Sequence, residues 1–125
     1  MLRRWAALGA IVVLCSSLIP VWGHHSYATF DMTRRLLVKG TVKSFEWVNP
    51  HTWLRVSVPG ADGISSVVWD IEAGPPNINA RRGWKPTDIR PGDKVECVIF
   101  PFRDGTPGGS LVSVTLPDGK VLRGR

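Results

Sequence analysis

The sequence predicts an all-β protein, and three observations support this fold class. Short runs rich in β-branched and aromatic residues are separated by Gly, Pro, Asn and Asp, as in barrels and sandwiches. No amphipathic helical stripe of any length occurs. The one segment suited to a short helix lies between the third and fourth runs. We therefore expect a small, five-stranded, partly open barrel of the OB type with an extended N-terminal arm, and a two-sheet sandwich is the alternative.

The first half of the barrel is predicted from two long runs and a hairpin. The first strand is expected at 36–48, where Gly40 marks a bulge or bend that would let one strand serve two sides of a barrel. After the turn "NPH", a second strand at 52–59 precedes "GADG", a hairpin signal. The third strand is expected at 65–73.

The second half begins with the turn-rich segment "GPPNINARRGWKPTDIRPGD", which has room for one short helix near 77–82. The fourth strand is expected at 94–102. The loop "RDGTPGG" leads to the fifth strand at 110–116, and "PDGK" offers a last hairpin to 121–123.

Residues 1–23 have the three zones of a secretory signal: a basic start, an apolar run and a short polar end. Val21 and Gly23 are small enough for positions −3 and −1 of a signal-peptidase site, which predicts export to the periplasm or medium. A retained anchor is the alternative, but the apolar run is shorter than the roughly 20 residues of a spanning helix, and Pro20 interrupts it. The expected organisation is a signal at 1–23, an arm at 24–33 and a barrel at 34–125.

Cleavage would leave about 100 residues, enough for one small domain. Its single cysteine, Cys97, lies between alternating valines, which predicts a buried hydrophobe and no internal disulfide. Loss of Arg3 and Arg4 lowers the formal net charge from +6 to +4. The basic residues are scattered, so we expect no nucleic-acid partner and no stable membrane span after cleavage.

Several motifs together resemble one protein family. They are "HHSYATFD", "GTVKSFEWVNPHTWLRVSV", "WDIE", "RRGWKPTDIRPGDKV" and "LPDGKVL". The chain resembles DUF6152, a family of small exported bacterial proteins of unknown function, over nearly the whole mature length. The resemblance implies export and a compact β-domain, and no established activity comes with it. Ile78 and Asn79 depart from the Pro-Asn-Leu-like segment expected between the third and fourth strands.

The three histidines predict a metal site, because they fall in only two places. His24 and His25 would begin the mature chain, and His51 lies in the turn "NPH". The terminal amine and ring of His24 could chelate one metal, with His51 opposite and His25 as a possible fourth donor. Nitrogen donors in this arrangement favour copper. Asp31 or Glu72 could orient an imidazole.

Other uses of these residues stay open. The histidine pair could be solvated, and His51 could bridge its turn through a backbone hydrogen bond. The rival function is a non-catalytic module that binds a small ligand or an exported partner protein through the aromatic turn "EWVNPHTW". Its candidate ligand-binding residues are Trp47, Asn49, Trp53 and Glu72. No catalytic motif is present, which argues against a stand-alone hydrolase or kinase.

Overall fold

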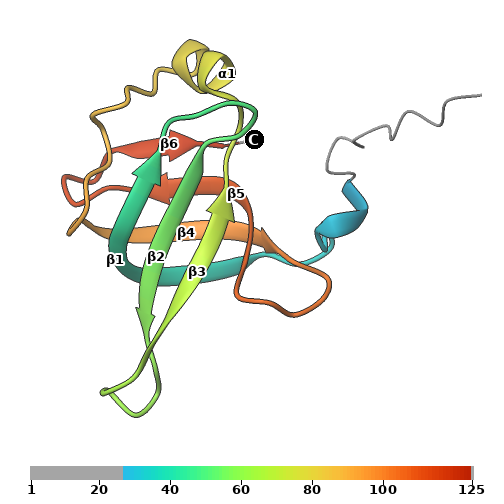
Figure 1. Cartoon of the computed structure of the whole chain (residues 1–125), viewed down its shortest axis with the longest axis vertical. Coiled ribbons are helices and arrows are strands. Elements are labelled where there is room, and N and C mark those ends of the chain that lie inside the picture. The colour runs from blue at the N-terminus through green and yellow to red at the C-terminus, as the bar shows by residue number, and fades with distance from the viewer. Residues whose placement is uncertain (1–26, 125) are drawn as a thin grey trace, which may run out of the picture.

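The computed structural model describes residues 27–124. The predicted signal, its cleavage point, His24 and His25 lie outside this range. Within it, no helix is long and apolar enough to cross a membrane. The elements follow the predicted order (Figure 1): η1 (Tyr27–Thr29), β1 (Leu36–Glu46), β2 (Trp53–Pro59), β3 (Ser66–Glu72), α1 (Pro76–Arg81), β4 (Lys94–Pro101), β5 (Gly108–Thr115) and β6 (Val121–Arg123).

The strands form one sheet that closes on itself. Their order is β3-β2-β1-β4-β5-β6, and a parallel pairing of β3 with β5 joins Asp70–Glu72 to Gly108–Ser110. Five strands therefore make a closed barrel, β6 extends the sheet beyond β5, and α1 lies between β3 and β4. The predicted OB-type fold class is confirmed.

The first strand serves two sides of the barrel, as expected. Residues Leu36–Thr41 pair with β4, and Thr41–Glu46 pair with β2. The register shift lies between Val42 and Ser44, and not at Gly40. Gly40 is needed for a different reason: a Cβ there would lie 2.3 Å from the Ser57 carbonyl oxygen. Glycine at this position lets the backbones of β1 and β2 approach closely where β1 bends.

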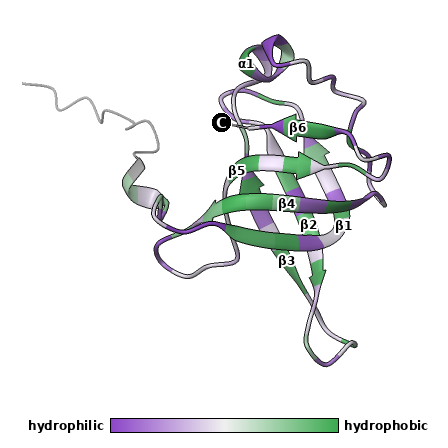
Figure 2. Cartoon of the chain, turned by 180° about the vertical axis from the view of Figure 1, so that it is seen from behind, coloured by the Kyte–Doolittle hydropathy of each residue, from purple (hydrophilic) through white to green (hydrophobic). Residues whose placement is uncertain are grey.

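The core fills the barrel with alternate residues of the strands. In β4, Val95, Cys97 and Ile99 point inward and are buried, while Glu96 is exposed. Figure 2 shows the same division, with apolar residues concentrated along the strands and polar residues in the loops. The buried apolar set comprises Val38, Val42, Leu54, Val56, Ile71, Ala73, Trp84, Ile89, Val95, Cys97, Ile99, Leu111, Val114, Leu116 and Leu122.

The described part of the N-terminal arm is fastened to the barrel. Phe30 is only 1% exposed, and its ring stacks on that of Phe102 with centroids 5.4 Å apart. The Asp31 N–H donates to the Pro101 carbonyl at 2.8 Å, and the Arg103 N–H donates to the Thr29 carbonyl at 3.0 Å. Residues 29–31 therefore have a fixed place beside the end of β4.

The Cys97 thiol is expected to be inert in the native protein. The side chain is fully buried between β1 and β5, and burial raises its pKa from 9.0 to about 12. Because the thiolate is the reactive form, almost none is present near neutral pH. A thiol reagent such as Ellman's reagent should label Cys97 in denaturant but not in buffer. Rapid labelling of the folded protein would contradict this packing.

Candidate functional site

A histidine and a buried carboxylate meet at one end of the barrel. The Nδ1 atom of His51 lies 3.0 Å from Oε1 of Glu72. The Glu72 side chain is 3% exposed, whereas that of His51 is 26% exposed. A carboxylate is very rarely buried without a partner, because removing its charge from water is costly. His51 supplies such a partner and connects the buried carboxylate to the surface.

Backbone pairing brings these two side chains together. Trp53 of β2 stands opposite Glu72 of β3. The pairing continues past the strands, because the Ala73 N–H donates to the Thr52 carbonyl at 2.8 Å and the Thr52 N–H donates to the Gly74 carbonyl at 3.1 Å. His51 is therefore held next to the chain that leaves β3, and its position does not depend on a long loop.

Asn79 secures the same corner, although no sequence motif marks it as a site residue. Its side chain is fully buried although it lies in α1. The side-chain Nδ2 donates to the Gly74 carbonyl at 2.9 Å and to the Thr52 hydroxyl oxygen at 3.1 Å. Asn79 thus ties α1 to the two segments that follow His51 and Glu72. These bonds pair the buried amide nitrogen, while the buried Oδ1 of Asn79 has no hydrogen-bond partner among the described residues.

The geometry has a direct chemical consequence. When one imidazole nitrogen hydrogen-bonds to a carboxylate, the other nitrogen is the one available to bind a metal or exchange a proton. Carboxylate–histidine–metal arrangements in proteins use this division, since the carboxylate orients the ring and makes it a stronger donor. In His51 the nitrogen that faces Glu72 is Nδ1, so the second ring nitrogen is Nε2. Of the two carboxylates predicted as orienting groups, Glu72 has this position, whereas Asp31 bonds to Thr33 and Arg34.

His51 also lines an open pocket of about 380 Å³. The pocket is lined by residues of the arm, α1, β4 and the C-terminal end. In Figure 1 the C-terminal end lies near the β1–β2 loop. The lining residues of the pocket are Met32, His51, Gly74, Pro75, Ile78, Arg82, Phe100 and Gly124. The presence of Met32 matters because it places the arm beside His51.

The described residues alone do not complete a metal centre. Within residues 27–124, no group of three or more His, Cys, Asp or Glu side chains could hold a metal ion. His24 precedes Tyr27, the first residue of η1, by three residues, a stretch that spans at most roughly 10 Å when extended. Met32, which follows the predicted ligands His24 and His25 in the arm, lines the same pocket as His51.

The predicted aromatic ligand residues are divided between the core and the surface. Trp47 is half-buried and packs against the core, with its ring 6.1 Å from that of Phe45. Trp53 is half-buried on β2, between Glu46 of β1 and Glu72 of β3 in the register. Asn49 is exposed in the turn. Trp53 and Glu72 are thus neighbours on adjacent strands, whereas Trp47 contributes to packing.

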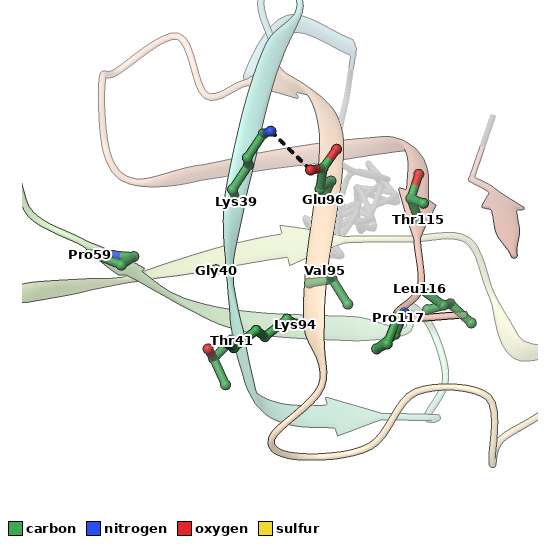
Figure 3. A pocket seen from close by; sticks show the side chains of 10 residues that line it. All are labelled: Lys39, Gly40, Thr41, Pro59, Lys94, Val95, Glu96, Thr115, Leu116 and Pro117. Carbon is green, nitrogen blue, oxygen red and sulfur yellow. Dashed lines mark ion pairs between the residues drawn. The ribbon is translucent and has the colours of Figure 1, made fainter. Parts of the chain in front are cut away.

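A second open pocket, of about 610 Å³, lies over β1, β4 and the end of β5 (Figure 3). Lys39 and Glu96 form an ion pair of 2.9 Å at this pocket. None of the predicted site residues lines it, and its lining residues include no histidine or cysteine. The candidate site is therefore the pocket at His51.

Fold and site together define a small OB-type barrel with a carboxylate-supported histidine at the mouth of a surface pocket. The chain belongs to DUF6152, a family of unknown function whose model matches residues 11–111. The family assignment made from the sequence motifs is thus confirmed. No curated protein and no solved structure matches the chain.

Proposed function

We propose that this protein is exported and binds a copper ion through His24 and His51, with His25 as a further donor. The observation that carries the proposal is the 3.0 Å contact between Nδ1 of His51 and the buried carboxylate of Glu72. Because Nδ1 of His51 faces Glu72, Nε2 is the donor in this proposal. A buried carboxylate beside a partly exposed imidazole is also an arrangement that raises the donor strength of the ring.

The remaining donors come from the mature N-terminus. Cleavage after Gly23 gives His24 a terminal amine, and this amine and its ring can close on one ion as a chelate. Together with Nε2 of His51 they supply three nitrogens, a set that Cu(II) favours over Mg²⁺ or Ca²⁺. An unperturbed amine has a pKa near 8 and an imidazole near 6.5, so the metal displaces their protons around neutral pH.

The test is a Cu(II) titration of the protein isolated from an exporting host, after mass spectrometry has identified its first residue. Binding to the folded state should raise the free energy of unfolding by about 2.7 kcal/mol when free metal is a hundred times the Kd. An increase in the thermal midpoint that depends on metal concentration is the expected result. A midpoint unchanged by Cu(II) in protein that begins at His24 would reject the proposal.

Exchanging Glu72 for glutamine is expected to lower the Cu(II) affinity about 10- to 100-fold. The glutamine amide has nearly the same shape as the carboxylate, but it lacks the negative charge that supports His51. Isothermal titration calorimetry measures the change.

Glu46→Gln provides the matched control, because Glu46 lies on β1 opposite Trp53 and pairs with Arg55, whereas the carboxylate that contacts His51 is Glu72. The Cu(II) affinity of the Glu46→Gln variant should stay within about threefold of that of the wild type, as expected for an exposed charge. Equal affinities for the Glu72→Gln variant and the wild type would remove Glu72 from the site.

The second candidate function is a binding module for a small ligand or an exported partner. One observation favours it: the half-buried Trp53 stands between Glu46 and Glu72 in the register, on a strand face that OB barrels commonly use for binding. A substitution at His24 distinguishes the two proposed functions. His24→Ala, with the cleavage point preserved, should abolish the chelate and leave a ligand bound at Trp53 unaffected.

A further inference from the structure

The hairpin of β2 and β3 projects beyond the barrel, as Figure 1 shows. Its strand β3 pairs with β2 along its whole length, from Ser66 to Glu72. On the other side, β5 pairs only with residues 70–72 of β3. Within the part of the chain that the structure describes, no strand therefore pairs with the outer edge of residues 66–69.

Two hydrogen bonds show which backbone groups face that edge. The Gly60 N–H donates to the Ser65 carbonyl at 2.8 Å, so Ser65 faces β2. The Asp70 N–H donates to the Pro107 carbonyl at 3.2 Å, so Asp70 faces away from β2. Backbone groups alternate in direction along a strand. Ser66 and Val68 therefore direct their N–H and C=O groups outward, as Asp70 does.

This edge lacks the features that usually prevent strands from pairing with other chains. Natural edge strands are protected by Lys, Pro, bulges or inward charges. Residues 66–69 contain no charged residue and no proline, and their pairing with β2 has no register shift. The side chains beside the outward groups are also apolar and exposed, at 46% for Val67 and 45% for Val68.

We propose that two copies of this protein associate by pairing these edges, as antiparallel strands centred on Val67. In that register Ser66 of one copy stands opposite Val68 of the other. Each of the two pairs then joins the outward N–H and C=O groups of both residues, giving four hydrogen bonds. The two Val67 side chains meet at the centre, where antiparallel neighbours come closest.

A second copy fits this edge for a specific reason. The chain carries a formal net charge of +6, or +4 after the proposed cleavage, so two copies repel each other on the whole. Residues 66–69 carry no charge, and a symmetric pairing brings the same uncharged segment together from both sides. The interface is isologous, and every favourable contact on one side is repeated on the other.

Val68→Pro tests the pairing. Proline removes one outward N–H from each copy, so the dimer loses two hydrogen bonds, whereas the ladder to β2 keeps its donors. We expect the wild-type protein to show a concentration-dependent dimer in sedimentation equilibrium, and Val68→Pro to raise the dimer Kd about 30-fold. Val67→Lys is a second test that does not introduce proline. It places two like charges together at the centre of the interface and should therefore also weaken the dimer.

Ile64→Lys is the matched control, because Ile64 is 93% exposed but lies in the hairpin turn, outside the paired segment. It should leave the Kd within about threefold of the wild type. Backbone amide exchange at Ser66 and Val68 should also slow as the protein concentration rises. A monomer up to about 1 mM, or a dimer unaffected by both edge substitutions, would overturn the proposal.

Discussion

Replacing His51 by alanine is expected to lower the Cu(II) affinity about 100-fold or more, because it removes a direct ligand of the proposed site. Loss of a supporting residue costs about 10- to 100-fold, so loss of the ligand itself should cost at least as much. Isothermal titration calorimetry or competition with a chromophoric chelator gives the Kd. Copper binding should then no longer raise the thermal midpoint at metal concentrations that saturate the wild type.

The substitution also leaves the buried Glu72 carboxylate without its 3.0 Å contact to His51, so a folding defect must be separated from a binding defect. A second variant does this without touching the barrel. One residue added before His24 moves the free amine off the chelate and leaves the contact between His51 and Glu72 intact. Both variants should lose affinity, and the extended variant should keep the apo stability of the wild type. Copper bound equally well by all three proteins would show that it binds elsewhere.

Much of the fold follows from local patterns. The alternation in "KVECVIFP" predicts β4, because period-2 burial is the signature of a strand with one buried face, and Val95, Cys97 and Ile99 are indeed buried. The turn "GADG" predicts the hairpin between β2 and β3, because it combines an aspartate that accepts turn hydrogen bonds with a glycine at positive φ. The helix predicted at 77–82 begins one residue earlier, at Pro76.

The features that could not be predicted are those that join distant segments. Nothing near residues 70–72 indicates a parallel pairing with Gly108–Ser110, which closes the barrel. The bend of β1 was assigned to Gly40, but the register changes after Val42. A glycine can serve either a bulge or a close backbone approach, and the two have the same sequence signal.

The candidate site shows the same limit. The turn "NPH" singles out His51, but Glu72 could be named only as one of two possible orienting carboxylates. Their contact depends on the register of β2 with β3, in which Trp53 stands opposite Glu72. A shift of one residue would turn Glu72 to the other face of the sheet and break the pair. The strand register is therefore what converts two separate residues into a site.

The other large effect is expected from Trp84→Ala, which should lower the free energy of unfolding by about 3–5 kcal/mol. Trp84 is 3% exposed, stacks on Phe45 at 6.4 Å, and donates from Nε1 to the Arg123 carbonyl at 3.0 Å. Alanine would leave a large cavity and an unpaired carbonyl, and β6 would lose a tie to the barrel.

Trp69 provides the comparison for this prediction. Its side chain is only half-buried on β3, where it packs against the core. Trp69→Ala should therefore cost clearly less than Trp84→Ala, because less apolar area leaves water when Trp69 folds into place. Urea titrations of both variants should show lower midpoints with the slope of the wild type. A loss below about 1 kcal/mol for Trp84→Ala would mean that this ring does not hold the end of the barrel together.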